Sequence, residues 1–167
     1  MGTRTVIISN STPLINFAAI QRLDILETLF GKIWIPTAVE RELLEKGKLY
    51  PSTEALKTRW STLIETHPIK NVLLRMVLKL NIDDGEAEAI TLAVEQNAQW
   101  LLLDEERGRT IAASYNISCL GSIGCLIRAK RIGLIPAIKP LLDAMQTEAR
   151  FWVSAALYRT ILKEYNE

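Results

Sequence analysis

Trp100-Leu-Leu-Leu103-Asp104-Glu105 is the stretch of the chain that indicates its fold most directly. Four consecutive apolar residues that end in two acids are typical of a strand buried on both faces, with a polar edge where it stops. Strands of this kind belong to parallel sheets whose two faces are covered by helices. We therefore expect an α/β protein with its chemistry near residues 104 and 105.

Other segments on either side of this strand repeat the same alternation. Thr5–Ser9 is a second apolar, β-branched run. The polar segment Asn10–Pro13 after it is a suitable helix start, with Ser11 or Thr12 as the cap and Pro13 in the first turn. Strands are also expected at 32–35, 60–69 and 117–120, and helices near 14–18, 23–30, 39–46, 51–57, 72–80, 83–97, 106–114, 122–132, 137–148 and 154–164. Alternating strands and helices predict one α/β domain over residues 1–167, with a mainly parallel sheet covered on both faces.

Composition excludes several classes of protein. The 167 residues are 49% hydrophobic and 23% charged, which is enough apolar material for a sizeable core and excludes a disordered chain. Twenty Lys and Arg against nineteen Asp and Glu give a net charge of +1, so the bulk charge does not indicate nucleic-acid binding. Any basic surface would have to be local.

Cysteine and histidine usage narrows the chemistry further. Cys119 and Cys125 have no CxxC spacing and do not form a disulfide framework, and His67 is the sole histidine. A histidine-based zinc site or a Ser-His-Asp triad is therefore not expected. The chain has no run of 18 apolar residues and no apolar stretch of signal-peptide length near residue 1, so we expect a soluble cytoplasmic protein without a membrane segment.

Polar residues gather where the predicted strands end. Ligands of open parallel sheets bind outside the carboxyl ends of the strands. Several acids at one rim would repel one another without a cation, and Mg²⁺ or Mn²⁺ suits such oxygen ligands. The residues in question are Asn10 and Ser11 after the first strand, Glu42 in the helix after the second, Glu86 in the first turn of the helix before residues 100–103, and Asp104 with Glu105.

Each of these residues also has a structural interpretation. Glu86 alone would be a surface acid that favours a helix dipole, and Glu42 alone would belong to a solvated face. Asn10 alone would be an ordinary turn residue. Their joint placement at one rim of the sheet carries the metal-site hypothesis.

Five segments in a specific order resemble the PIN domain family, in particular its prokaryotic toxin-like subgroup. They are Val6–Ile15, Ile35–Leu43, Gly85–Ala93, Leu101–Arg109, and Gly121–Gly124 leading into Arg128–Pro136. The resemblance covers about residues 5–143, and a helical segment at about 150–165 follows it. It implies a three-layer, Rossmann-like α/β/α fold and a metal-dependent single-strand endoribonuclease, often the toxin of a toxin–antitoxin pair.

The resemblance also implies a set of site residues. The family's acids around Mg²⁺ or Mn²⁺ fall at Asn10, Glu42, Glu86 and the Asp104-Glu105 pair, with the choice within the pair left open. Ser11 or Thr12 matches the family's hydroxyl after the first acid. The expected metal ligands are Glu42, Glu86, Asp104 and Glu105, bound directly or through water.

Asn10 departs from this pattern, because the family has an aspartate there. An amide oxygen can ligate a hard cation but brings no charge, which weakens the attraction for a dication. Three interpretations stay open: a natural variant with weakened metal use, a PIN domain without catalysis that binds RNA or a protein, or an aspartate changed to silence a toxin.

Basic and aromatic residues give weaker signals. Arg41, Arg107 and Arg109 are candidates for RNA contact because they neighbour the predicted acids, whereas solvated faces and salt bridges are favoured for Arg128, Lys130 and Arg131. The four tryptophans are interpreted as packing residues. In the C-terminal segment core packing is favoured over an interface; its apolar residues are Phe151, Trp152, Val153, Leu157 and Ile161.

Two further inferences concern partners and a competing class. The resemblance implies single-stranded RNA as substrate, an antitoxin protein and a homodimer as partners. A nucleotide-binding domain is set aside, because neither a GxGxxG nor a Walker loop follows the first strand.

Overall fold

A five-stranded, all-parallel sheet forms the centre of the computed structural model, which describes residues 5–46 and 53–167. Its strands are β1 (Ile7–Ser9), β2 (Ile33–Pro36), β3 (Ile64–His67), β4 (Trp100–Leu102) and β5 (Cys119–Leu120), in the order β3-β2-β1-β4-β5. Every neighbouring pair is parallel. The α/β class predicted from the alternating pattern is confirmed.

Ten helices surround the sheet within the described residues. They are α1 (Ser11–Ala19), α2 (Leu23–Phe30), α3 (Thr37–Lys46), α4 (Thr53–Leu63), α5 (Val72–Leu78), α6 (Asp84–Gln96), α7 (Glu106–Ser114), α8 (Ser122–Arg131), α9 (Lys139–Glu148) and α10 (Ala155–Glu164). None of the helices in 5–46 and 53–167 has the length and apolar character needed to cross a membrane.

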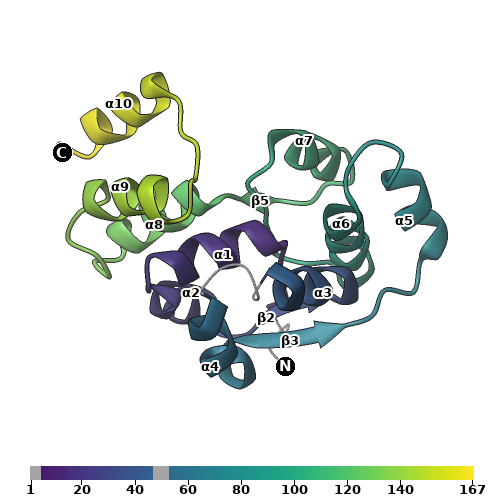
Figure 1. The fold of residues 1–167 in the computed structure, drawn as a ribbon. Coiled ribbons are helices and arrows are strands. Elements are labelled where there is room, and N and C mark those ends of the chain that lie inside the picture. The colour runs from purple at the N-terminus through teal and green to yellow at the C-terminus, as the bar shows by residue number, and fades with distance from the viewer. Residues whose placement is uncertain (1–4, 47–52) are drawn as a thin grey trace.

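Two separate apolar cores lie on opposite faces of the sheet, as the pleat of β1 requires. Ile7 packs on one face in a core shared with α1, α2, α8 and α9, whereas Ile8 packs on the other face against α6 and α7. Figure 1 shows α5, α6 and α7 grouped on one side, with α1, α2, α8 and α9 on the other. This is the three-layer α/β/α arrangement that the resemblance implies.

The order of the strands creates a crevice beside β1. The chain runs outward from β1 through β2 to β3, then crosses to the opposite side of β1 for β4 and β5. At such a switch point the connections leave in opposite directions, so a ligand site opens at the carboxyl ends of β1 and β4. The backbone N–H of Asn10 donates to the carbonyl oxygen of Leu102 over 3.0 Å, which holds the two strand ends together.

The predicted boundaries of a helix and a strand near Trp60 are wrong. A short helix at 51–57 and a strand over 60–69 were expected, but α4 runs to Leu63 and the strand is only Ile64–His67; residues 51 and 52 lie outside the described part. Leu56 and Leu63 are seven residues apart and both buried, so they form one apolar stripe of a helix. The loose alternation around Trp60 is overridden by this burial.

The basic cluster of α8 has structural partners, as the salt-bridge interpretation predicted. The guanidinium of Arg128 lies 5.6 Å from the ring centre of Trp100, and Arg131 donates to the hydroxyl of Tyr165 over 3.0 Å. The ammonium of Lys130 lies 3.2 Å from a carboxylate oxygen of Glu167. These contacts tie α8 to the sheet and to the end of α10.

The C-terminal apolar segment divides between core and surface. Val153 and Ile161 are buried in the first core, so core packing is confirmed for them. Trp152 is 81% exposed and Leu157 is 46% exposed, so for these two the packing interpretation is wrong. Neighbours in an extended segment point in opposite directions, and burial of Val153 turns Trp152 outward.

We expect Glu167→Gln to loosen α10. The carboxylate of Glu167 accepts from the backbone N–H groups of Ile138 (2.8 Å) and Lys139 (2.7 Å) as well as from Lys130. Loss of its charge should lower stability by about 1 kcal/mol and the melting temperature by roughly 2–4 °C. The matched control is Glu164→Gln, since Glu164 is exposed and 3.9 Å from Arg131. Equal melting temperatures for both variants in a calorimetric scan would contradict this role.

Candidate active site

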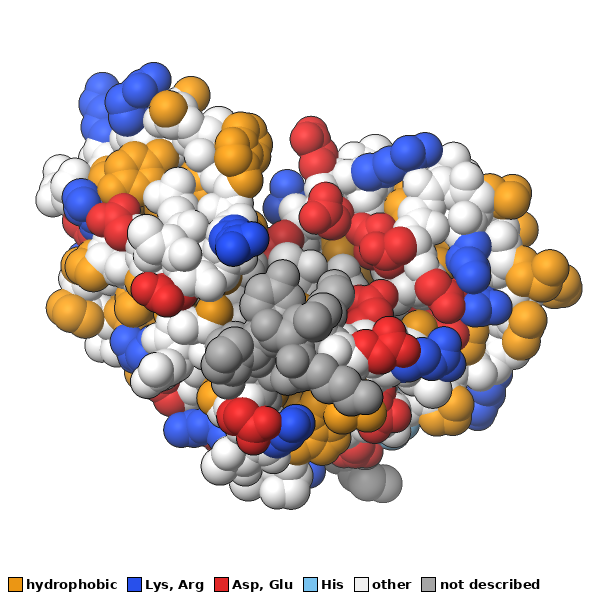
Figure 2. Space-filling view, in the orientation of Figure 1, with side chains coloured by type: hydrophobic (Ala, Val, Ile, Leu, Met, Phe, Trp, Pro, Cys, Tyr) orange, Lys and Arg blue, Asp and Glu red, His pale blue; other side chains and the backbone are white. Residues whose placement is uncertain are grey.

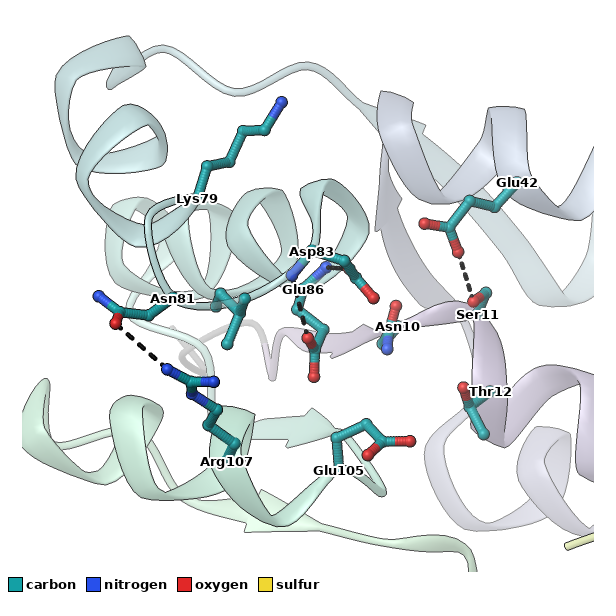
Figure 3. A pocket seen from close by; sticks show the side chains of 11 residues that line it. Asn10, Ser11, Thr12, Glu42, Lys79, Asn81, Asp83, Glu86, Glu105 and Arg107 are labelled. Carbon is teal, nitrogen blue, oxygen red and sulfur yellow. Dashed lines mark hydrogen bonds between the residues drawn. The ribbon is translucent and has the colours of Figure 1, made fainter.

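A cavity of about 540 Å³ opens at the carboxyl ends of β1 and β4, where the switch point predicts a ligand site. Figure 3 shows its polar side chains converging from α1, α3, the start of α6 and the start of α7. Seven of the residues named from the sequence line it: Asn10, Ser11, Thr12, Glu42, Glu86, Glu105 and Arg107. Lys79, Asn81, Ile82 and Asp83 complete the lining.

Asn10 is buried at the centre of this group, with 3% of its surface exposed. It occupies the N-cap position of α1, where an asparagine side chain commonly accepts from the first helical N–H groups. Here it makes no such bond, and its Oδ1 is buried without a hydrogen-bond partner in the described part of the chain. The amide oxygen therefore faces the cavity with its bonding capacity unused (Figure 3).

Glu86 is the second buried group with an unused oxygen. It stands in the first turn of α6 in a capping box: the carboxylate of Asp83 accepts from the Glu86 N–H over 2.8 Å, and Glu86 Oε2 accepts from the Asp83 N–H over 3.3 Å. Glu86 is 5% exposed, and its Oε1 has no hydrogen-bond partner among the described residues. Burial, and then the nearby charges of Asp83, Glu105 and Glu42, raise the pKa of Glu86 to about 7.

Glu42 reaches the cavity from the second turn of α3. The hydroxyl of Ser11 donates to its Oε2 over 2.6 Å, which orients the carboxylate. The hydroxyl predicted after the first acid position therefore serves this acid. A cap on α1 was expected from Ser11 or Thr12, but Asn10 takes the cap position.

Two glycines leave the space that these carboxylates occupy. A Cβ at Gly85 would collide with Oε1 of Glu42, and one at Gly108 would lie 2.7 Å from Oε1 of Glu86 and 2.9 Å from a methyl carbon of Leu103. Any larger residue would displace the carboxylate, because its end is the mobile partner in the contact. Both glycines are therefore positioning residues for the acids beside them.

Asp104 lies in a neighbouring cavity rather than in this one, while Glu105 lines both. Asp104 accepts from the backbone N–H (2.6 Å) and hydroxyl (2.7 Å) of Ser122 and from the amide of Asn16 (3.3 Å). Burial raises the pKa of Asp104, against the opposing effect of the Ser122 bonds. Of the two candidates for the fourth acid, Glu105 therefore faces the first cavity and Asp104 is held at its border.

The predicted RNA-contact residues are divided between different places. Arg107 lines the first cavity and donates to Asn81 over 3.3 Å, and Arg109 lines the second cavity. Arg41 is exposed on α3 and lines neither cavity. Lys79 was missed, because the segment between α5 and α6 carries no motif, whereas Asp83 could have been found from the Asp-x-x-Glu spacing of a capping box.

A comparison with protein families decides the identity of this fold. The PIN domain family DUF3368 matches residues 6–167, which includes the whole sheet and both cavities. The chain belongs to the PIN domain family. A search of curated proteins finds no match to the chain. The PIN fold is generally a nuclease fold, and the family assignment made from the five segments is confirmed.

PIN domains commonly use divalent metals, and the cavity has the donors for one. In 5–46 and 53–167 no three His, Cys, Asp or Glu side chains are close enough together to form a metal cluster by themselves. Of the three buried side-chain oxygens without partners among the described residues, Asn10 Oδ1 and Glu86 Oε1 belong to residues that line this cavity, where a donor or a cation would satisfy them. Hard oxygen donors of this type suit Mg²⁺ or Mn²⁺.

The pKa of Glu86 predicts a stability difference that depends on pH. Because it is raised to about 7, the folded state keeps a proton that the unfolded state loses from about pH 4.5 upward. Without metal, the wild-type PIN domain should therefore lose stability between pH 5 and pH 8, and Glu86→Gln should not lose this part. We expect the variant's advantage in melting temperature to grow by roughly a few degrees over this range. Thermal scans in EDTA, with exposed Glu148→Gln as control, check this; a constant difference would contradict it.

Gly108→Ala should disturb the site more than the fold. The new methyl group displaces the Glu86 carboxylate and presses on the buried side chain of Leu103, while alanine within α7 favours the helix by about 0.5–1 kcal/mol and offsets part of that cost. We expect a melting temperature no lower than that of Gly124→Ala, with the stabilisation by Mn²⁺ reduced by about half or more relative to the wild type. Gly124→Ala is the matched control, because that methyl group would meet Leu120 instead of a carboxylate. A full Mn²⁺ response in Gly108→Ala would contradict the positioning role.

Proposed function

We propose that this PIN domain is a divalent-metal-dependent endoribonuclease that cuts single-stranded RNA, with Mg²⁺ or Mn²⁺ as cofactor. One observation carries the proposal: Asn10 and Glu86 each keep a buried oxygen without a partner in one cavity, beside Glu42. Unsatisfied buried acceptors cost free energy, so they mark a place built for a ligand. Lys79 and Arg107 at the same cavity provide positive charge for phosphate groups.

Each side chain has a distinct part in the proposed reaction. Asn10, Glu42 and Glu86 would hold the cation, which when bound lowers the pKa of water and stabilises charge on the phosphoryl oxygens. The hydroxyl of Ser11 keeps the Glu42 carboxylate turned toward the cavity. Lys79 and Arg107 line the same cavity and would contact phosphate oxygens of the RNA. Glu105 or Asp104 completes the acid set, through its place in the cavity or at its border.

Asn10→Asp tests whether the uncharged amide of Asn10 weakens metal binding at this site. The added charge should tighten Mn²⁺ binding by about tenfold or more and speed cleavage, because a carboxylate attracts a dication more than an amide does. The measurement is Mn²⁺-dependent cleavage of a mixed single-stranded RNA pool, with Mn²⁺ affinity from thermal shift. Asn97→Asp, exposed at the other end of α6, is the control. Glu86→Gln should abolish cleavage when it is introduced into the wild-type protein and also when it is introduced into the Asn10→Asp variant.

The outcomes separate the possible functions. Cleavage by wild type and Asn10→Asp establishes a ribonuclease that tolerates the amide. Cleavage by Asn10→Asp alone identifies a silenced nuclease. No cleavage by either would overturn the proposal and favour the second candidate, a PIN domain without catalysis that binds RNA or a protein, which the uncharged Asn10 supports. Comparing Asp104→Asn with Glu105→Gln then assigns the fourth acid by the larger loss.

We also propose, on the resemblance to the toxin-like subgroup, that the chain is the toxin of a toxin–antitoxin pair and acts in the cytoplasm. An antitoxin protein would then cover the acidic cavity. A homodimer is supported by apolar side chains on and after α5 that are more than half exposed, which is unusual for a surface without a partner. These residues are Val72, Leu73, Met76, Val77 and Leu80.

A further inference from the structure

A second cavity, of about 940 Å³, lies beside the candidate active site. It is bounded by the start of α7, the turn from β5 into α8, and the segment 149–154 that joins α9 to α10. Figure 2 shows the surface hollowed between the α7 side, where acidic side chains gather, and the α8–α10 side, where basic and apolar ones are mixed. Thr12 and Glu105 line both cavities, so the two cavities adjoin at these side chains.

Trp152 is the side chain of this second cavity that contributes least to the folded core. At 81% exposure it is the most exposed of the large hydrophobic side chains in the described residues, although Val153 next to it is buried. Leu157 and the partly buried Phe151 line the same cavity beside it. Leaving an indole in water forgoes the hydrophobic free energy that its burial would supply, so the ring is available for a ligand.

Two arginines line the cavity together with this ring. Arg109 lies in α7, and Arg150 directly follows Ala149, the residue that caps the end of α9. Arg150 has a φ of +54°, the left-handed conformation that follows many helices and normally favours glycine or asparagine. Glu105 and Glu106 lie at the start of α7, so phosphate groups are expected nearer the two guanidinium groups.

We propose that the second cavity is a subsite for single-stranded RNA, in which a base stacks on Trp152 and the adjoining phosphates contact Arg109 and Arg150. This inference rests on the proposed function, since it extends the path of the same RNA beyond the cleavage site. Aromatic rings paired with cations bind single strands with little sequence preference, because every base has a flat face to stack. The shared lining at Thr12 and Glu105 lets one strand occupy both cavities.

The test measures the affinity of a fluorescein-labelled 12-nucleotide single-stranded RNA by anisotropy, in EDTA to prevent cleavage. Trp152→Ala should weaken binding on the order of tenfold, and Trp152→Phe should restore most of it, because the stacking face is kept. Tyr115→Ala is the matched aromatic control: Tyr115 is 39% exposed after the far end of α7 and lines neither cavity. Melting temperatures should stay equal, since Trp152 contributes little buried surface.

Arg150→Asn distinguishes the contribution of the Arg150 charge to RNA binding from the effect of its left-handed backbone on stability. Asparagine suits the left-handed conformation, so stability should be equal or higher, while affinity falls several-fold at low salt and the salt dependence becomes shallower. With Mn²⁺ present, Trp152→Ala should raise the KM for RNA cleavage and leave kcat within about twofold, because the ring binds substrate away from the reacting phosphate.

Each outcome decides between the subsite and its alternatives. If the wild type binds or cuts RNA and Trp152→Ala does so equally well, the subsite is wrong and the proposed function stands. If the wild type neither binds nor cuts RNA, both fail. If Trp152→Ala instead changes the mass measured by sedimentation with RNA affinity unchanged, the face is an interface between copies of the chain, which also overturns the subsite.

Discussion

The parallel pairing of β1 with β4 is the contact on which the candidate site depends. Ile7, Ile8 and Ser9 lie opposite Trp100, Leu101 and Leu102, and the Asn10 N–H extends the pairing by one further bond to the Leu102 carbonyl. Because neighbouring parallel strands end at the same edge, this register brings Asn10 beside the segment that carries Asp104 and Glu105. The chain departs from β1 and β4 in different directions, which opens the cavity between them.

Around that edge the protein keeps polar groups that reduce its stability when no ligand is bound. Glu86 is buried among other acids, and burial with their charges raises its pKa to about 7. Its Oε1 and the Oδ1 of Asn10 lack partners among the described residues, although nearly all buried oxygens in proteins have one. Gly85 and Gly108 leave room for the carboxylates instead of filling the space with apolar groups. Function retained at the cost of stability is the usual reason for such an arrangement.

The predictions made from local sequence patterns are correct where the burial of side chains and the backbone propensity favour the same element. The strand before Asp104, the helix that starts near residue 83 and the helix at 23–30 are all present as expected. The prediction failed where partners distant in sequence decide the outcome. Helix α4 extends to Leu63 because Leu56 and Leu63 both reach the core, and Trp152 is exposed because Val153 takes the buried position. Nothing in the neighbouring residues distinguishes these cases beforehand.

By itself the sequence determined the class of the fold, its family, and the position of most acids at the carboxyl rim, because hydrophobic periodicity and strand ends are local properties. Only the tertiary structure decided which acids share a cavity. Glu42 of α3 and Glu86 of α6 line the same cavity. Asp104 instead lines the second cavity, where it accepts hydrogen bonds from Ser122 and Asn16. It also decided that Trp152 and Arg150 line the second cavity together with Glu105. Such proximity depends on how helices far apart in the chain pack on the sheet, and no local pattern of residues encodes it.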